Sequence, residues 1–329
     1  MLRFLLIRPD KMGDAVITQV VIEALAKTVP CKIDLFASNY NYKFYQDNPY
    51  LENVFHCDVE KKRSTREYYK NVCGKTAYDA VFVLQSRRRL QKLVLLSKCR
   101  VRIGFDLIFD TRISVKLFQW FMHGFYHFTY VNYNLNQHEL LNIHDVINAG
   151  LLKLQLPNLV ALPPQCRLYA NIIQPAIKVV GSLIINVSGK VAEQKNILPS
   201  QLTALLLLVV NKASKIAIVT TLADLPMVEE AVAYMLECNP QIASIAIICE
   251  EDIFVVMNKV NAFDYYVGPD GGLLHIAAAL GLKCVGLFND DVKKRWYPWT
   301  PTQVSLSMPN SYAISTVAII NALQRLGLQ

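Results

Sequence analysis

Short apolar runs alternate with helical stretches from the start of the chain. Apolar residues dominate 3–8 (RFLLIR) and 31–37 (CKIDLFA), and between them 14–28 (DAVITQVVIEALAKT) repeats apolar residues at helical spacing. Short apolar runs are typical of buried strands, and the order strand–helix–strand opens a parallel βαβ unit. The pattern therefore predicts an α/β fold.

The alternation continues along the rest of the chain. In the first half we expect strands at 80–84 and 99–104 and a basic amphipathic helix at 87–97. In the second half we expect strands at 182–187, 215–220, 245–249, 264–267 and 283–288. Helices are expected there at 199–212, 226–237, 253–260, 272–280 and 311–326.

A proline-rich segment separates the two halves. Periodicity is lost over 151–182, where Pro157, Pro163, Pro164 and Pro175 interrupt the chain. Prolines at such spacing are typical of loops and linkers. We predict an N-terminal domain at 1–155, a linker at 156–180 and a C-terminal domain at 181–329, each a doubly wound parallel sheet. The last helix is expected to be able to pack back on the N-terminal domain.

Composition argues against a membrane-spanning or exported chain. The longest apolar run, 202–210 (LTALLLLVV), falls short of the roughly 20 residues of a spanning helix, so we interpret it as a buried helix. The apolar stretch at 4–7 is too short for a signal-peptide core. The eight cysteines are dispersed without a CxxC pair, which indicates mostly buried, reduced thiols and neither a zinc site nor a disulfide framework. A cytoplasmic location is expected.

The net charge of +8 lies almost wholly in the first half. Residues 1–150 carry 21 Lys and Arg against 14 Asp and Glu, whereas residues 151–329 carry 13 against 12. A basic surface favours acidic partners, so the first half is expected to meet nucleic acid, an anionic membrane or a phosphorylated ligand.

The loop at 8–14 (RPDKMGD) follows the first strand. Open α/β sheets place ligands at the carboxyl ends of their strands, so Asp14 is a candidate general base. Since Asp is also favoured at helix starts, Asp14 could instead be only an N-cap. The loop lacks the GxGxxG pattern of a dinucleotide site.

Two segments of the second half could bind an anion. In 266–280 (YVGPDGGLLHIAAAL) a strand leads into a glycine turn and a helix, whose first N–H groups, with His275, could bind a phosphate. The alternative is an ordinary βα turn with a buried histidine. In 186–195 (NVSGKVAEQK), Ser188, Gly189 and a lysine could form an anion nest, or the segment could be a solvated loop.

Basic and aromatic residues also cluster in the first half. They are the basic runs Lys61–Arg63 and Arg87–Arg89 and the aromatic segment 118–130 (FQWFMHGFYHFTY). Basic helices beside aromatic residues can dock on anionic membranes, although charge runs are also common on ordinary solvated faces.

Three of these stretches together resemble glycosyltransferase family 9, the lipopolysaccharide heptosyltransferases. The opening RFLLIRPDKMGDAVITQVVIEAL resembles the family's first strand, its R-x-D-[KR]-[IM]-G-D loop and first helix. YYVGPDGGLLHIAAALGLKCVGLF resembles its D-[TS]-G-x-x-H-x-A-A-A-L-G-x-P segment, and INVSGKVAEQKNILPSQL resembles the loop that ends in a donor-contacting lysine.

The resemblance implies a GT-B type fold, with two Rossmann-like domains facing a cleft. It implies acceptor binding in the N-terminal half and nucleotide-sugar binding in the C-terminal half, with Asp14 as the catalytic base. The donor residues that it implies are Ser188, Gly189, Lys195, Asp270, Gly271, Gly272 and His275, with Asp224 as a candidate for the donor ribose. For the acceptor or the membrane surface we single out Lys11, Arg63, Arg87, Arg88 and Arg89.

The implied activity is inverting transfer of a sugar, heptose from ADP-heptose, to a lipopolysaccharide core or related glycolipid. No metal, cofactor or nucleic acid is expected, and the protein is expected to lie peripherally on the cytoplasmic face of the inner membrane. The sequence departs from the family at Gly271, where a Thr or Ser is usual, and at Cys284, where a proline is usual. A nucleotide-sugar epimerase on the same architecture and a non-catalytic donor- or glycolipid-binding relative remain the alternatives.

Overall fold

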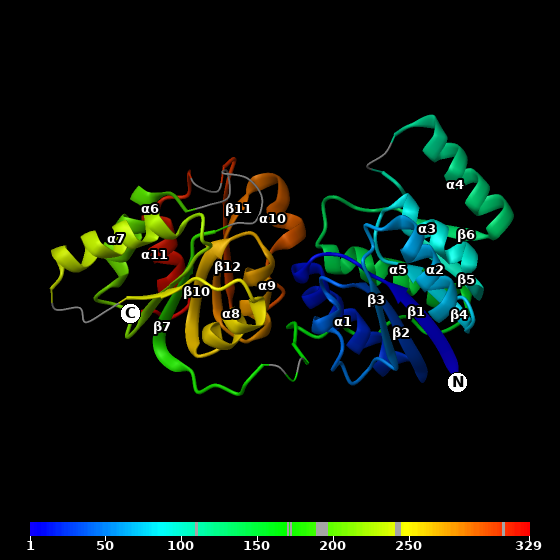
Figure 1. The fold of residues 1–329 in the computed structure, drawn as a ribbon, viewed down its shortest axis with the longest axis horizontal. Helices are drawn as coiled ribbons and strands as arrows, with labels where there is room; N and C mark the ends of the chain where they lie inside the picture. Colours follow the sequence, from blue (N-terminus) through cyan, green and yellow to red (C-terminus); the bar gives the residue numbers. More distant parts are fainter. Residues whose placement is uncertain (109–110, 170, 172, 189–196, 241–244, 311–312) are drawn as a thin grey trace. The chain divides into compact units, whose positions relative to one another are not determined.

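The computed structural model describes residues 1–329 except 109–110, 170, 172, 189–196, 241–244 and 311–312. The chain divides into two compact units (Figure 1). Unit 1 comprises Met1–Pro163 with Arg167–Ala170, and unit 2 comprises Pro164–Cys166 with Asn171–Gln329. Each unit is built around one parallel sheet.

The sheet of unit 1 has six parallel strands in the order β3-β2-β1-β4-β5-β6. They are β1 (Leu2–Ile7), β2 (Cys31–Ser38), β3 (Asn53–Cys57), β4 (Ala77–Val83), β5 (Lys98–Phe105) and β6 (Phe128–Val131). The order reverses between β1 and β4. This reversal is the topological switch point, at which open α/β sheets bind ligands.

Helices cover both faces of this sheet. They are α1 (Met12–Thr28), α2 (Lys62–Val72), α3 (Arg88–Leu93), α4 (Ile113–Tyr126) and α5 (Glu139–Lys153), with short 3₁₀ turns η1 (Tyr42–Phe44) and η2 (Val94–Leu96). Alternate strand residues point to opposite faces. Leu5 and Ile7 pack with the α2–α4 side, whereas Phe4 meets Phe82 edge to face on the other. Burial on both faces explains why these strands are apolar throughout.

Unit 2 repeats the topology with the strand order β12-β11-β10-β7-β8-β9. Its parallel strands are β7 (Val179–Asn186), β8 (Ile216–Val219), β9 (Ala246–Ile248), β10 (Phe263–Pro269), β11 (Lys283–Asn289) and β12 (Gln303–Met308). Its switch point lies between β7 and β10. The two units therefore present equivalent sheet edges for binding.

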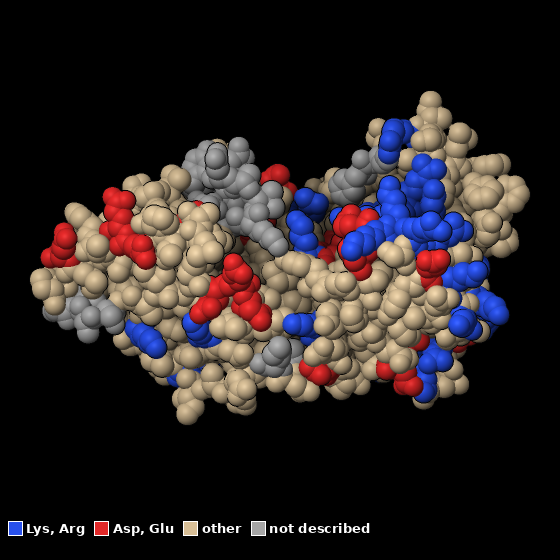
Figure 2. Space-filling model, in the orientation of Figure 1, with Lys and Arg blue, Asp and Glu red and all other residues tan. Residues whose placement is uncertain are grey.

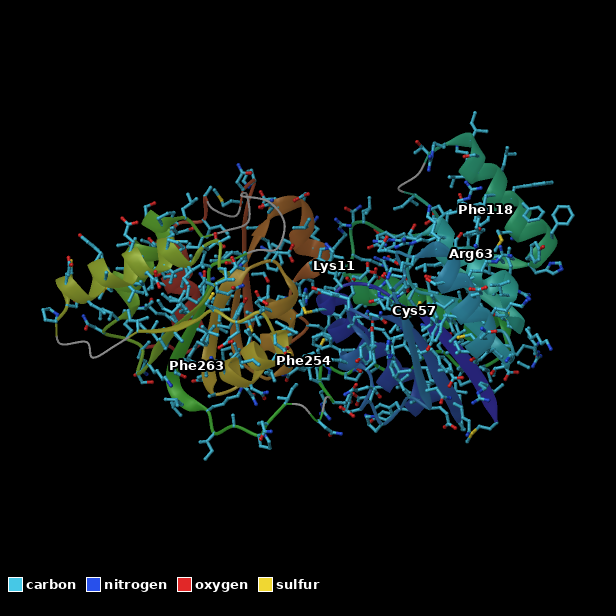
Figure 3. The ribbon with its side chains drawn as sticks, in the orientation of Figure 1. Lys11, Cys57, Arg63, Phe118, Phe254 and Phe263 are labelled. Carbon is cyan, nitrogen blue, oxygen red and sulfur yellow. The ribbon has the colours of Figure 1, made fainter. Side chains whose placement is uncertain are left out.

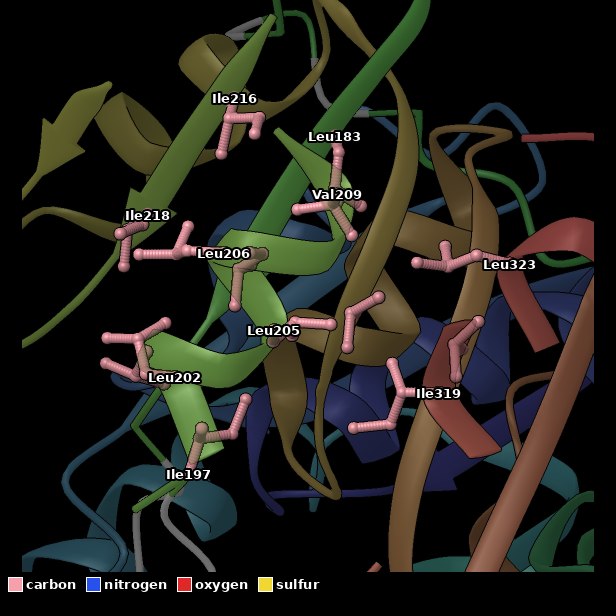
Figure 4. Close-up of a cluster of buried hydrophobic side chains, with 14 of the residues drawn as sticks. Leu183, Ile197, Leu202, Leu205, Leu206, Val209, Ile216, Ile218, Ile319 and Leu323 are labelled. Carbon is pink, nitrogen blue, oxygen red and sulfur yellow. The ribbon is translucent and has the colours of Figure 1, made fainter. Parts of the chain in front are cut away.

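Two apolar cores enclose the sheet of unit 2. Its helices are α6 (Pro199–Val209), α7 (Leu225–Cys238), α8 (Ile253–Val260), α9 (Gly272–Ala279), α10 (Asp290–Trp296) and α11 (Thr316–Arg325). Figure 4 shows one core, in which Leu202, Leu205 and Leu206 of α6 lie with Ile319 and Leu323 of α11. We expected α11 to be able to pack back on the N-terminal half, but its apolar face belongs to the core of unit 2.

Most predicted elements are present, with some differences. The apolar run at 202–210 is only partly buried, because Leu207 and Leu208 are each 43% exposed on the outer side of α6. The predicted helix at 87–97 is a short α3 followed by η2. In the described part of the chain, no helix has the length and apolar character needed to cross a membrane. All eight cysteines are free thiols, but only Cys73, Cys166 and Cys284 are buried.

Helix α5 packs closely on the sheet at Gly150. A Cβ atom built there would overlap the ring of Phe82 on β4. Gly150→Ala should therefore destabilise unit 1 by about 1–3 kcal/mol, the usual cost of overpacking a core. Gly124→Ala is the matched control, since a Cβ on that helical glycine meets no atom within 4 Å and should stabilise α4 by up to about 1 kcal/mol. Urea unfolding of both variants measures the two changes, and equal midpoints would contradict the packing argument.

Candidate functional site

The centre of the site in unit 1 is the guanidinium of Arg8, which is 1% exposed. Three carboxylates surround it: Asp10 at 3.1 Å from Nη1, and Asp14 at 2.8 Å and Glu139 at 3.0 Å from Nη2. Although burial lowers the pKa of Arg8, the three carboxylates raise it, and the net shift is upward. A buried charge needs such compensation, so this cluster is a strongly constrained ionic group.

The backbone fixes Arg8 at the switch point. Its N–H donates to the carbonyl of Phe36 on β2, and its own carbonyl accepts from Nδ2 of Asn41 at 3.0 Å. Its Nη1 donates to the carbonyl of Leu84, just beyond β4. The side chain therefore joins the ends of β1 and β4, the two strands between which the sheet reverses.

Asp14 lies in the first turn of α1, two residues after its start at Met12. The N-cap is Lys11, and no side chain caps that helix end. The interpretation of Asp14 as only an N-cap is therefore wrong. Its Oδ1 is instead held by Arg8, while its side chain stays 15% exposed. Asp14 is thus oriented by a buried cation and reachable from outside.

The other two carboxylates differ from Asp14 in burial. Burial raises the pKa of the Asp10 carboxyl to about 7, although Arg8 lowers it, and Gln85 donates to the carboxylate. Burial also raises the pKa of Glu139, against the lowering effects of Arg8 and of a hydrogen bond from Tyr133. Near neutral pH the cluster therefore shares a proton, which reduces the repulsion between its carboxylates.

A cavity of about 310 Å³ opens at the carboxyl ends of β1, β2 and β3. Its lining includes Asp10, Lys11 and Arg87 together with Asn39 and Tyr40. The wall thus combines two cations, one carboxyl and uncharged polar groups. Such a surface suits a ligand with several hydroxyl groups and negative charge.

The five basic residues selected from the sequence have different surroundings. Lys11 and Arg87 line the cavity, whereas Arg89 forms a two-point ion pair with Glu60 at 2.9 and 2.6 Å. Arg88 lies 4.7 Å from the ring centre of Phe118 on α4. Arg63 is exposed on α2 (Figure 3), and Figure 2 shows Lys and Arg gathered over this part of unit 1. The three consecutive arginines are therefore not one equivalent set.

In unit 2, residues after β7 and β8 meet at the switch-point edge. Oγ of Ser188 donates to Oδ2 of Asp224 at 2.6 Å, and Oγ1 of Thr221 donates to the same oxygen at 3.1 Å. Nδ2 of Asn186 donates to the carbonyl of Ser188 at 3.3 Å. The structure thus brings Ser188 and Asp224 together. Gly189 and Lys195, selected from the same loop, lie outside the described residues.

The glycine segment after β10 has the predicted strand–turn–helix form. Asp270 donates its N–H to the carbonyl of Leu287, Gly271 is the extended N-cap, and α9 begins at Gly272. His275 is buried in the first turns of α9, with its ring 6.3 Å from that of Trp296. Four of the predicted donor residues therefore lie on one turn and helix start beside β7. A Cβ at Gly271 would meet no atom closer than 3.9 Å, so a larger side chain would fit there.

Sequence reasoning missed Glu139 and Tyr133 as parts of the site. Glu139 opens α5 and lies 131 residues from Arg8, so no local pattern connects them. A signal was nevertheless present, because the arginine of the opening loop directly follows an apolar strand. A charge placed there must be buried beside partners from elsewhere in the chain.

The comparisons with known proteins point in the same direction. The sequence model of Glycosyltransferase family 9 (heptosyltransferase) matches residues 201–324. A search of curated proteins found no match to the sequence. The fold matches that of E. coli heptosyltransferase WaaC with ADP, at 15% identity and a TM-score of 0.75, over 99% of this chain and 100% of that chain.

Two further solved structures share the fold. The glycosyl transferase family 9 protein from Veillonella parvula is 14% identical, with a TM-score of 0.76 over 99% of this chain and 97% of that one. E. coli ADP-heptose lps heptosyltransferase II is 15% identical, with a TM-score of 0.70 over 99% and 98%. These likenesses confirm the predicted α/β fold of GT-B type, and the family match identifies unit 2 as a glycosyltransferase family 9 domain.

Proposed function

We propose that the protein is an inverting, metal-independent glycosyltransferase that moves a sugar, heptose from ADP-heptose, onto a lipopolysaccharide core or related glycolipid. The observation that carries the proposal is the carboxylate of Asp14, held by buried Arg8 at the switch point of unit 1. The family match in unit 2 and the ADP and ADP-heptose named for similar structures support the donor.

Asp14 acts as the general base in this proposal. The acceptor hydroxyl attacks the anomeric carbon of the donor while Asp14 takes its proton, and the nucleoside diphosphate leaves from the opposite face. Arg8 fixes one carboxylate oxygen at 2.8 Å, so the other is free to turn toward the acceptor. A base held by a buried cation loses little orientation entropy when the substrate binds.

Unit 2 binds the donor. The turn at Gly271 and the start of α9 present backbone N–H groups to the diphosphate, and the helix dipole favours negative charge there. Asp224, placed by Ser188, is the candidate partner of the ribose hydroxyls. Lys195 and His275 would stabilise the leaving diphosphate in place of a divalent cation.

The cavity of unit 1 is the proposed acceptor subsite. Lys11 and Arg87 would face the acidic sugars or phosphates of the acceptor, while Asn39 and Tyr40 offer hydrogen-bonding groups. Such an acceptor is a membrane glycolipid, so the protein is proposed to work peripherally on the cytoplasmic face of the inner membrane. The positive excess of residues 1–150 agrees with an anionic acceptor and surface.

A non-catalytic relative that binds donor or glycolipid is the second candidate, and Gly271 favours it. The residue removes a hydroxyl that the family usually offers to the phosphate. Donor hydrolysis and sugar-transfer assays distinguish the two candidates, because only the enzyme consumes donor when acceptor is added.

Asp14→Asn should lower kcat by at least about 100-fold, since the amide cannot accept the acceptor proton. The dissociation constant for ADP, measured by calorimetry, should change little. Glu139→Gln is the matched control, because it also removes one carboxylate from Nη2 of Arg8 but leaves the base in place. A loss in Glu139→Gln as large as that in Asp14→Asn would show that the charge balance of Arg8, and not a base, limits turnover.

Gly271→Ser should tighten ADP binding about tenfold, because a hydroxyl donor to a charged phosphate contributes roughly 1.5 kcal/mol or more. The backbone there is extended and the Cβ position is open, so the fold should not change. Gly268→Ser is the control, since its Cβ would lie 2.6 Å from the hydroxyl of Tyr266 and should destabilise unit 2. Unchanged ADP affinity in Gly271→Ser would place the phosphate elsewhere.

The pKa of Asp10 predicts how stability depends on pH. A carboxyl whose pKa rises from 3.8 to about 7 on folding binds a proton that the unfolded chain has already released. The free energy of unfolding should therefore fall as pH increases from about 4 to about 7, and level off above. Asp10→Asn removes this titration, so urea unfolding of this variant between pH 5.5 and 8 should give a flatter profile. A profile as steep as that of the wild type would assign the dependence to Glu139.

A further inference from the structure

Helix α4 carries large apolar side chains on the side that faces away from its own unit. Trp120 is 67% exposed, Phe125 65% and Leu117 61%, and Ile113 and Phe121 are also exposed. The opposite side packs into the core through Val115, Phe118 and Met122. In Figure 1, α4 stands out from the other helices of unit 1.

The exposed residues form one continuous surface along the helix. At about 100° per residue, Ile113, Leu117, Trp120, Phe121 and Phe125 fall within an arc of about 140°, centred opposite the buried side. The ring centres of Phe121 and Phe125 lie 5.1 Å apart, and those of Trp120 and Phe125 lie 6.1 Å apart. A helix that is apolar on every side needs apolar surroundings on every side, and water does not supply them.

The charge around this surface is positive. Helix α4 contains no acidic residue and includes Lys116, and Arg112 is its N-cap. Beneath it, Arg88 and Lys92 of α3 lie 4.7 and 5.7 Å from the ring centre of Phe118. The apolar surface is therefore attached to a basic helix, which is the arrangement of an interfacial helix on an anionic membrane.

We propose that α4 docks the protein on an anionic lipid bilayer, with Ile113, Leu117, Trp120, Phe121 and Phe125 inserted at the boundary between headgroups and acyl chains. Tryptophan and phenylalanine favour that boundary, and the cations of α3 and α4 would meet lipid phosphates. A second copy of the chain is a poorer occupant. A two-fold contact through α4 would place the Lys116 side chains and the other cations of both copies near one another.

The inference names the surface by which the proposed enzyme would meet its acceptor, and it rests on the proposed function only for that purpose. The test therefore uses binding alone. The full chain is sedimented with vesicles of 70% phosphatidylcholine and 30% phosphatidylglycerol, and with pure phosphatidylcholine, at low and high salt. The variant replaces Leu117, Trp120 and Phe125 by Ser. The matched control replaces Leu135, Leu152 and Val160, three exposed apolar residues of unit 1 outside α4, by Ser.

We expect the α4 variant to bind the anionic vesicles at least about tenfold more weakly than the wild type at both salt concentrations, and the control to bind like the wild type. Tryptophan emission of the wild type should shift to the blue and be quenched by brominated lipids, and Trp120→Phe should lose that response. Equal vesicle binding by the α4 variant, or an unchanged emission, would overturn the proposal. So would sedimentation of the wild type as a dimer that the α4 variant converts to a monomer.

Donor binding separates this inference from the proposed function. The α4 variant should keep the ADP affinity of the wild type and its activity on a delipidated acceptor, while losing activity on acceptor in vesicles. Loss of vesicle binding without any transferase activity in the wild type would support the docking helix and refute the enzyme. Normal transfer to acceptor in vesicles by the α4 variant would do the reverse.

Discussion

The buried guanidinium of Arg8 is the interaction on which unit 1 depends. It joins β1 to the carbonyl beyond β4 and reaches Glu139 at the start of α5, so one side chain connects three segments of the chain. A charge with so little exposure is stable only while its carboxylates remain in place. The same requirement orients Asp14. The group that stabilises the fold and the group that positions the candidate base are thus one and the same.

The two units use one topology for different tasks. In both, the strand order reverses once, and the selected residues follow the strands on either side of that reversal. Unit 1 has a charged cluster and a polar cavity there, whereas unit 2 has a glycine turn and a helix start. This division agrees with a base and an acceptor on one side of the reaction and a diphosphate on the other.

The sequence predicted the elements that are apolar throughout, because burial on both faces leaves an unambiguous pattern in β1, β4, β7 and β10. It did not predict β3, β6, β12, α2, α4, α5 or α10. Several of these, such as α2 and α10, are short and largely polar, whereas α4 is aromatic on every side and shows no amphipathic period. In the site, Asp14 and the glycine segment could be found from local pattern. The pairing of Arg8 with Glu139 could not, since it is a long-range contact that only the folded chain creates.

The strand order also has a consequence for folding during synthesis. The strands β1, β2 and β3 lie within the first 57 residues and can pair as soon as they leave the ribosome. The other half of the sheet begins at β4, and the last carboxylate of the Arg8 cluster is made 131 residues after Arg8 itself. Until then, Arg8 cannot be fully neutralised in a dry interior. The nascent chain must therefore hold this end of β1 in water, and the switch point is the last part of unit 1 to close.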